Sequence, residues 1–373
     1  MYFDVGGPLL SQRGESMKST RRDKTIRLAV AGVGNCASSL IEGICYYRQH
    51  PEDERGLLFP VLGGYSVRDI EVVAAFDISR EKVGSPLCEA ILKAPNNFVR
   101  IPGEIEVDEP AVVQRGPTLD GNPPHLAVLV SESPAAPVDV AAVLRENKAD
   151  VLVNLLPTGS LEASAHYARA ALGAGCAFVN CIPTVLAQKP EVQEQFRQKK
   201  LIVLGDDIKS QLGTTILHRT LLQMLQLRGA ALVKTSQVNI GGNTDFANFV
   251  YRADSKLVSK HKSMAGLLGD AAFHVGHHYD LTKGPLKNAY IEIDATVFGG
   301  SPVKVSVKLE SDDKPNSAGS VVDLIRLAKA AMDGGNGGII PEACAFYMKS
   351  SPVQINEDEA FGLIKQNWAT NPG

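Results

Sequence analysis

The chain has 373 residues, a formal net charge of −3 at pH 7 and 44% hydrophobic residues, which suits one large domain or two. A charge near zero excludes the basic footprint of a nucleic-acid-binding protein, and no apolar run approaches the length of a membrane span. The six cysteines include no Cys-x-x-Cys pair, which is typical of free thiols in a reducing, cytoplasmic compartment. Residues 1–24 are polar and are predicted to form a disordered tail, in which Met17 is an alternative start.

The first predicted element is a strand over residues 26–31, followed by Gly32-Val33-Gly34 and a helix that runs to about Tyr47. Glycines let the backbone approach a phosphate, and a helix N-terminus supplies free N–H groups and partial positive charge. The small residues Ala37, Ser38 and Ser39 stand near the place of the usual third glycine. The pattern predicts a dinucleotide site at Gly32, Gly34, Asn35, Cys36 and Ala37. The alternative is a tight strand-to-helix turn of another α/β protein.

A second buried strand, over residues 71–77, ends in the acid Asp77. In nucleotide-binding folds such an acid receives the adenosine ribose hydroxyls, and an acid there selects NAD over NADP. It normally follows the glycines by about twenty residues, and here the loop over residues 51–66 is an insertion that lengthens the interval. The alternative is that Asp77 caps a helix that begins at Ser79.

Strands and helices then alternate up to residue 227. Strands are predicted over 149–157, 175–180 and 200–204, and helices over 139–147, 160–172 and 213–227. This order predicts a Rossmann-type doubly wound parallel sheet, with ligands at the carboxyl ends of its strands. The polar residues gathered at those ends are Pro157, Thr158, Gly159, Asp206, Asp207, Lys209 and Ser210. For Asp206, Asp207 and Lys209 the alternative is an internal ion pair.

Beyond residue 228 apolar and polar residues alternate, which indicates strands with one wet or oligomer-facing side over 232–240, 288–298 and 303–309. They predict a smaller α+β domain with a mainly antiparallel sheet. The expected domains are an NAD-binding domain over 25–228, a catalytic and oligomerisation domain over 229–311, and a C-terminal segment over 312–373. In that segment a helix over 320–332 is expected to return to the first domain. His277 and His278 are predicted to lie on a loop surface, and no metal site is predicted.

Lysines carry the candidate substrate chemistry. Lys256 and Lys260 lie four residues apart on a basic helix predicted over 251–268, where like charges repel unless an anion lies between them. Lys287 flanks a Gly-Pro turn, and Lys349 has an apolar setting in which a desolvated lysine can move protons. The alternatives are a solvated basic face for the first pair and, for Lys349, a side chain that reaches from a packed helix to water. The residues alone indicate oxidation next to a carbanion or enolate of a phosphorylated substrate.

Seven motifs together resemble the actinobacterial and archaeal type of inositol-3-phosphate synthase, over about residues 25–355. They are residues 32–39, 75–78, 114–121, 205–211, 239–243, 255–260 and 315–319. The resemblance implies tightly held NAD, a homotetramer and a redox-neutral cyclisation of glucose 6-phosphate to 1D-myo-inositol 3-phosphate, used in inositol and phospholipid biosynthesis. In that reaction the sugar is oxidised at C5, its enolate attacks the C1 aldehyde, and the product is reduced again.

By the same resemblance, Lys256 moves the proton at C5. Lys260, Lys287 and Lys349 bind phosphate or stabilise oxyanions, Lys209 and Asp207 complete the site, and Ser210, Asn243 and Asp245 bind the substrate. Departures from the family pattern lie in the substrate half, at residues 259–262, 282–287 and 243–245. They leave open a paralogue that converts another sugar phosphate, such as fructose 6-phosphate, to a five-membered cyclitol phosphate. A net dehydrogenase and an NAD-binding regulator are the remaining alternatives.

Overall fold

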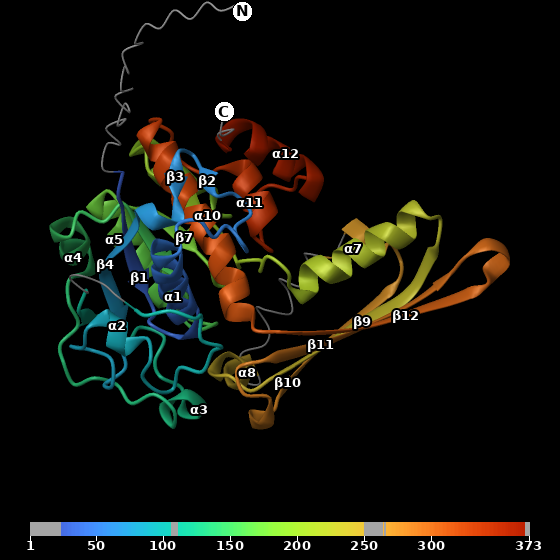
Figure 1. The fold of residues 1–373 in the computed structure, drawn as a ribbon, viewed down its shortest axis with the longest axis horizontal. Coiled ribbons are helices and arrows are strands. Elements are labelled where there is room, and N and C mark those ends of the chain that lie inside the picture. Colours follow the sequence, from blue (N-terminus) through green and yellow to red (C-terminus); the bar gives the residue numbers. More distant parts are fainter. Residues whose placement is uncertain (1–23, 106–110, 250–263, 265, 370–373) are drawn as a thin grey trace, which may run out of the picture.

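The computed structural model describes residues 24–105, 111–249, 264 and 266–369 (Figure 1). Residues 1–23 of the tail predicted over 1–24 lie outside the described residues, as do the two lysines Lys256 and Lys260. Figure 1 shows a sheet covered by helices, and a second sheet that extends away from it as a long arm. In the part of the chain that the structure describes, no helix is both long and apolar enough to cross a membrane.

The first sheet has six parallel strands in the order β5-β4-β1-β6-β7-β8. This is the strand order of a dinucleotide-binding fold, in which the direction of winding reverses beside the first strand. The strands are β1 (Ile26–Ala31), β4 (Ile70–Asp77), β5 (Val113–Arg115), β6 (Val151–Asn154), β7 (Ala177–Asn180) and β8 (Val203–Leu204). The predicted fold class is confirmed, although β8 is shorter than the strand expected over 200–204.

Helices cover both faces of this sheet, because successive side chains of a strand point to opposite sides. Val30 of β1 packs with α1 (Asn35–Gln49) and α10 (Asp313–Asp333), whereas Ala31 packs with α4 (Val140–Glu146) and α5 (Leu161–Ala174). Four further helices contribute buried residues to these cores: α2 (Leu87–Ala90), α6 (Pro190–Gln198), α11 (Pro341–Tyr347) and α12 (Glu357–Trp368). The first domain also contains the short helix α3 (Pro124–Ala127).

Helix α10 begins seven residues before the start expected at Ser320. The Asp312 side chain caps it by accepting a hydrogen bond from the Lys314 backbone N–H, at an Oδ1–N distance of 3.0 Å. Pro315 is tolerated in the first turn, because the backbone N–H that proline lacks would have no acceptor within the helix there. The motif over residues 315–319 therefore lies inside a helix that packs on the first sheet.

The insertion over residues 51–66 contains the short strands β2 (Val61–Leu62) and β3 (Tyr65–Ser66), followed by the turn η1 (Val67–Asp69). It is fixed to α10 by Arg326, whose side chain is fully buried. The Arg326 guanidinium donates to the carbonyl oxygens of Phe59 at 2.8 Å and Pro60 at 3.1 Å, and it forms an ion pair with Asp323. The buried guanidinium thus supplies hydrogen-bond donors to the backbone carbonyl oxygens of a loop that has little regular structure of its own.

Replacement of Arg326 by Met is expected to lower the free energy of unfolding by about 3–5 kcal/mol, because Asp323 would keep a buried charge without its partner. Urea unfolding followed by circular dichroism measures the loss. Arg169→Met is the matched control, since Arg169 is exposed on α5, and its effect is expected to stay within about 0.5 kcal/mol. Equal losses in the two variants would contradict the role assigned to Arg326.

The second sheet forms the arm and has the order β10-β9-β11-β12. Strand β10 runs parallel to β9, and the other pairs are antiparallel, so the sheet is mainly antiparallel as predicted. Its strands are β9 (Ala231–Gly241), β10 (Ala272–Tyr279), β11 (Lys287–Thr296) and β12 (Pro302–Ser311). Helix α7 (Thr214–Leu227) packs Leu222 and Leu225 against Ile291 and Ile293 on one face of the arm (Figure 1).

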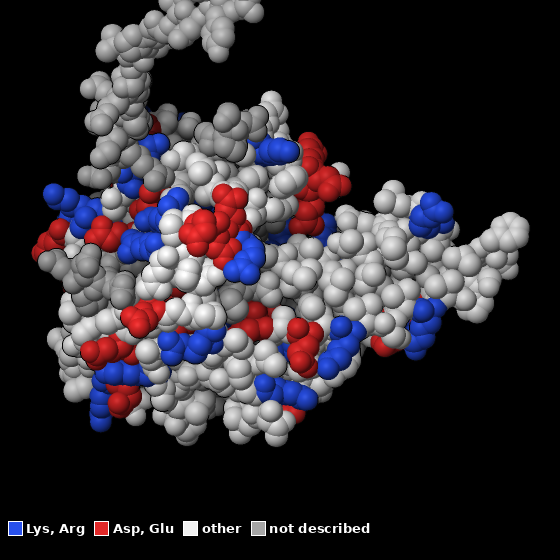
Figure 2. Space-filling model, viewed as in Figure 1, with Lys and Arg blue, Asp and Glu red and all other residues white. Residues whose placement is uncertain are grey.

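The prediction that His277 and His278 lie on a loop is wrong, because both belong to β10. Their segment escapes detection since a polar edge strand shows no apolar alternation. Short helical segments complete the arm: α8 (Thr244–Phe249), η2 (Leu281–Lys283) and η3 (Phe298–Gly300). Figure 2 shows basic and acidic side chains interspersed over the visible face of the molecule.

Candidate active site

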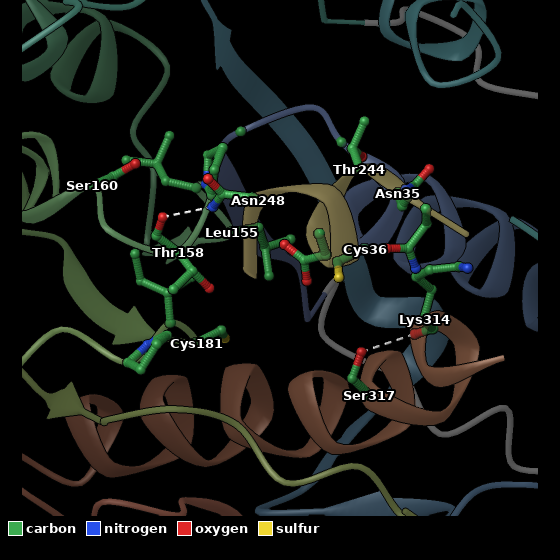
Figure 3. Close-up of a pocket in the computed structure, with 18 of the residues that line it drawn as sticks. Asn35, Cys36, Leu155, Thr158, Ser160, Cys181, Thr244, Asn248, Lys314 and Ser317 are labelled. Carbon is green, nitrogen blue, oxygen red and sulfur yellow. Dashed lines mark hydrogen bonds between the residues drawn. The ribbon is translucent and has the colours of Figure 1, made fainter. Parts of the chain in front are cut away.

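A cavity of about 310 Å³ opens at the carboxyl ends of the parallel strands, between the first sheet and the base of the arm. Its volume falls at the lower end of the range of about 300–1,000 Å³ that is typical of ligand sites. Figure 3 shows side chains of α1, of the loop after β6, of α8 and of α10 around it. The predicted site residues that line this cavity are Gly32, Gly34, Asn35, Cys36, Asp77, Pro157, Thr158, Asp207, Lys209, Ser210, Asn243, Asp245, Lys287 and Lys349.

Three other described residues of the predicted site lie outside this lining. Ala37 is fully buried in the first turn of α1, and Gly159 lies in the turn before α5 with a φ of +92°. Asp206 is buried and accepts hydrogen bonds from the Asn180 side chain at 2.7 Å and from the Leu186 backbone N–H at 3.0 Å. Burial raises the pKa of Asp206. This carboxyl group supports the loop after β7 and is not among the residues that line the cavity. Its partners named here are an amide and a backbone N–H rather than the cation of an internal ion pair.

The glycine turn after β1 lies close to the end of β6. Gly32 has a φ of +93°, and a Cβ atom on it would lie 2.8 Å from the carbonyl oxygen of Leu155. Gly34, which also lines the cavity, has no described heavy atom within 4 Å of its Cβ position apart from its chain neighbours. The first position is therefore fixed by packing within the protein, whereas the second leaves open space for a ligand.

Asp77 lines the cavity and also holds the glycine turn. One of its carboxylate oxygens accepts a hydrogen bond from the Val33 backbone N–H at 2.8 Å, and the other accepts one from Ser79 at 2.8 Å. The contact with Ser79 matches the alternative considered above, but residues 80–84 form turns rather than a helix. Each carboxylate oxygen has a second lone pair, so these contacts leave Asp77 able to accept hydrogen bonds from a ligand.

Lys82 is a cavity residue that the sequence analysis missed. It is only 3% exposed, and its ammonium donates to the Val33 carbonyl oxygen and to the Asn96 side chain, each at 2.7 Å. Burial lowers the pKa of Lys82, and the nearby Asp77 carboxylate opposes that shift. Lys82 belongs to a polar turn that resembles ordinary surface sequence, so no pattern marked it. Together Asp77 and Lys82 hold both polar backbone groups of Val33.

The predicted catalytic lysines Lys209 and Lys349 lie on neighbouring backbone segments. These segments pair through an antiparallel bridge between Ile208 and Met348. The Lys349 ammonium donates to Asp207 at 2.9 Å and to the Ile208 carbonyl oxygen at 2.6 Å. Asp207 is 1% exposed and has a φ of +62°, a conformation rare for residues other than glycine and often found at functional sites. Lys209, Asp207 and Lys349 therefore lie on paired segments that line the same cavity.

The start of α10 contributes further charged residues to the cavity. Lys287 forms an ion pair with Asp313 at 2.6 Å, and Lys314 forms one with Asp312 at 2.8 Å. Lys314 is 4% exposed and, like Asp313, lines the cavity. Both residues were missed because α10 was expected to begin only at Ser320.

The arm contacts the first domain through Asn248 of α8, which is 1% exposed. Its side-chain amide donates to the Thr158 carbonyl oxygen at 2.8 Å (Figure 3), and its amide oxygen lies 3.0 Å from Nε2 of His125 on α3. Thr158 follows the strand β6, so this contact joins the two walls of the cavity. Among the residues that the structure describes, no group of three His, Cys, Asp or Glu side chains is arranged to hold a metal ion.

This strand order, with a glycine turn and several lysines around one cavity, places the protein in the broad class of Rossmann-fold enzymes. A sequence profile described as myo-inositol-1-phosphate synthase matches residues 213–314. Inositol-3-phosphate synthase of Corynebacterium glutamicum is 44% identical over 351 residues, covering 90% of this chain and 96% of that protein. The same enzyme of Mycolicibacterium smegmatis is 43% identical over 348 residues, covering 90% and 95%. The chain belongs to the inositol-3-phosphate synthase family, which confirms the resemblance.

Solved structures share the fold of this chain. The crystal structure of Ari2 superposes with a TM-score of 0.77 at 35% identity, covering 92% of this chain and 98% of that one. Inositol-3-phosphate synthase of Caenorhabditis elegans superposes with a TM-score of 0.73 over 92% of this chain and 84% of that one. Its identity is 17%, so the second likeness concerns the fold alone.

Proposed function

We propose that this protein is an NAD-dependent inositol-3-phosphate synthase, which converts D-glucose 6-phosphate to 1D-myo-inositol 3-phosphate without net oxidation or reduction. One observation carries the proposal: the glycine turn with Asp77 and the lysines Lys209 and Lys349 line the same cavity. A cofactor bound at the turn and a phosphorylated sugar held by the lysines would then meet within one enclosed space. Family membership supports the same reaction.

The residues of the glycine turn fit a dinucleotide. Gly34 leaves open space where the backbone must approach a pyrophosphate, and the first N–H groups of α1 have no acceptor within the helix. Asp77 lines the cavity and would accept hydrogen bonds from a ribose. The chemistry that NAD would supply at this turn is reversible hydride transfer. The role of the turn is to hold the cofactor throughout the turnover, since a redox-neutral reaction uses the same molecule twice.

The lysines would bind the phosphate and stabilise negative charge that develops on the sugar oxygens. Preorganised cations in a site from which water is excluded are effective at this task, because they need little reorganisation during the reaction. Asp207 orients the ammonium of Lys349, and Asp313 orients that of Lys287. The proton transfer assigned to Lys256 and the phosphate role of Lys260 stay predictions, since both residues lie outside the described part of the chain.

The test is incubation with glucose 6-phosphate and a substoichiometric amount of NAD, followed by carbon and phosphorus NMR. Formation of inositol 3-phosphate without accumulation of NADH is the expected result. Fructose 6-phosphate is supplied in parallel, and turnover of that sugar alone would replace the proposed substrate by the five-membered carbocycle alternative. Stoichiometric NADH release would instead indicate a dehydrogenase, and NAD binding without any turnover would indicate a regulator.

Replacement of Lys82 by Met is expected to weaken NAD binding about tenfold or more, because a charge-assisted hydrogen bond contributes about 1.5–3 kcal/mol. The loss of the ammonium leaves the Val33 carbonyl oxygen with the Asn96 amide, at 3.2 Å, as its remaining donor, and so loosens the turn that would meet the pyrophosphate. Calorimetric titration with NAD measures the change. Lys93→Met is the control, since Lys93 is half-buried on the same side of the domain and donates to Ser85. Unchanged affinity in a folded Lys82→Met protein would contradict this role.

We further propose that the protein assembles as a homotetramer through the arm. Phe298 at the end of the arm is fully exposed, and Val233, Tyr290 and Val297 are each more than a third exposed. Exposed apolar side chains gathered on one part of a fold, here the arm, are typical of association surfaces. Sedimentation velocity tests this, and a monomer at micromolar concentration would contradict it.

A further inference from the structure

The ammonium of Lys209 is held from outside the cavity by the C-terminal helix. Lys209 is 8% exposed and lines the cavity next to Ser210. Its Nζ donates to Oε1 of Glu357 at 3.1 Å and to the Ala345 carbonyl oxygen at 2.9 Å. A lysine ammonium has three N–H donors, so these contacts leave one for a ligand. Glu357 is separated from Lys209 by 148 positions and is the first residue of α12.

A third charged group completes the arrangement. The second carboxylate oxygen of Glu357 lies 3.4 Å from Nε of Arg219, which is on α7. Glu357 and Arg219 are not among the described residues that line the cavity, so they reach a bound ligand only through Lys209. Arg219, Glu357 and Lys209 thus form a chain of alternating charge that runs from α7 through α12 into the site. Such an arrangement restricts a flexible lysine to one orientation.

We propose that Glu357 is a positioning residue, which fixes the ammonium of Lys209 and directs its remaining N–H donor to the substrate. The part of this inference that concerns substrate rests on the proposed function, whereas the control of Lys209 by Glu357 does not. A loosely held lysine side chain would lose rotational freedom each time it met a ligand, and the cost of immobilising such a side chain is about 0.5–1.5 kcal/mol. The salt bridge to α12 removes that cost before the substrate arrives.

The charges around Lys209 determine the direction in which its pKa changes when a neighbour is replaced. Burial lowers the pKa of Lys209, the Glu357 carboxylate raises it, and the positive charge of Arg219 lowers it. Two other charged groups nearby, Asp207 and Lys349, form an ion pair with each other. The Ala345 carbonyl oxygen of α11 accepts a hydrogen bond from Lys209. Removal of the Glu357 charge therefore leaves the burial and Arg219 effects unopposed, and the pKa of Lys209 must fall. Removal of Arg219 must shift it in the opposite direction.

The first test measures the amine itself. The full-length protein is labelled with trace acetic anhydride between pH 6 and 11, and the modification of Lys209 is quantified by mass spectrometry. In Glu357→Gln the midpoint of Lys209 labelling is expected to move down by about one pH unit or more. Glu359→Gln is the matched control, because Glu359 lies in the same first turn of α12 and is exposed. That variant keeps the original midpoint, whereas Glu357→Asp lies between the two.

The second test uses turnover of glucose 6-phosphate. At neutral pH, kcat/KM of Glu357→Gln is expected to fall about tenfold or more, since hydrogen bonds to charged groups contribute about 1.5–3 kcal/mol. The alkaline limb of its pH–rate profile is expected to move to lower pH. A purely structural loss would lower the rate without moving that limb. Should Glu357→Gln fail to fold, Arg219→Gln serves instead and shifts the Lys209 midpoint upward.

The outcomes separate two failures. An unchanged Lys209 midpoint in folded Glu357→Gln, or an equal shift in Glu359→Gln, overturns the positioning role. If the unmodified protein leaves glucose 6-phosphate unchanged while the labelling midpoint still shifts in Glu357→Gln, the proposed substrate is wrong and the control of Lys209 by Glu357 stands.

Discussion

Lys349→Met is expected to reduce kcat for inositol 3-phosphate formation by about 10²- to 10⁴-fold, the range found when a group that transfers protons or stabilises charge is removed. The Lys349 ammonium donates hydrogen bonds to Asp207 and to the Ile208 carbonyl oxygen. The segment that carries these two acceptors pairs with the segment of Lys349 through an antiparallel bridge. A cation fixed in this way meets a developing oxyanion without having to move. Methionine keeps most of the volume of the side chain and removes the charge.

The effect is expected in kcat more than in NAD affinity, because Lys349 lies on a different element from the glycine turn. Steady-state kinetics and a separate NAD titration distinguish the two quantities. Lys365→Met is the control, since Lys365 is exposed on α12 and has no part in the cavity. A Lys349→Met protein that folds and retains more than a tenth of the original kcat would remove Lys349 from the catalytic group.

The first domain was accessible from sequence because its elements carry local signals. The strand over residues 26–31 precedes a glycine turn, and the buried runs that became β4, β6 and β7 are short, apolar and followed by polar residues. In a parallel sheet those polar ends must meet at one edge. Strand order alone then explains why Asp77, Thr158 and Lys209, which are far apart in sequence, line one cavity.

What the sequence analysis missed depends on long-range packing. Lys82 is buried only because the turn that carries it packs against Val33 and Asn96. Glu357 contacts Lys209 only because α12 packs against α11, and nothing in its local sequence distinguishes it from Glu359. Strand β10 was overlooked because its pairing with β9, and not its own apolar pattern, makes it a strand. Such residues are found from the fold, after the local elements have been placed.

The two glycines of the turn should respond differently to the same added methyl group. In Gly32→Ala the new Cβ would lie 2.8 Å from the Leu155 carbonyl oxygen, on a backbone with a φ of +93°. A side chain in such a conformation costs about 1–3 kcal/mol. We therefore expect Gly32→Ala to lower both the thermal midpoint of unfolding and the affinity for NAD. The turn itself would have to move.

Gly34→Ala is expected to leave the thermal midpoint unchanged or slightly higher, while NAD affinity falls about 10- to 100-fold, equivalent to a steric cost of about 1–3 kcal/mol. The reason is that Gly34 has a φ of −92°, which alanine adopts freely, and no described heavy atom beyond its chain neighbours lies within 4 Å of the new Cβ. The methyl group would instead occupy the space where a pyrophosphate meets the backbone. Thermal unfolding with and without NAD measures both quantities, and undiminished NAD binding by Gly34→Ala would show that the cofactor does not lie against this turn.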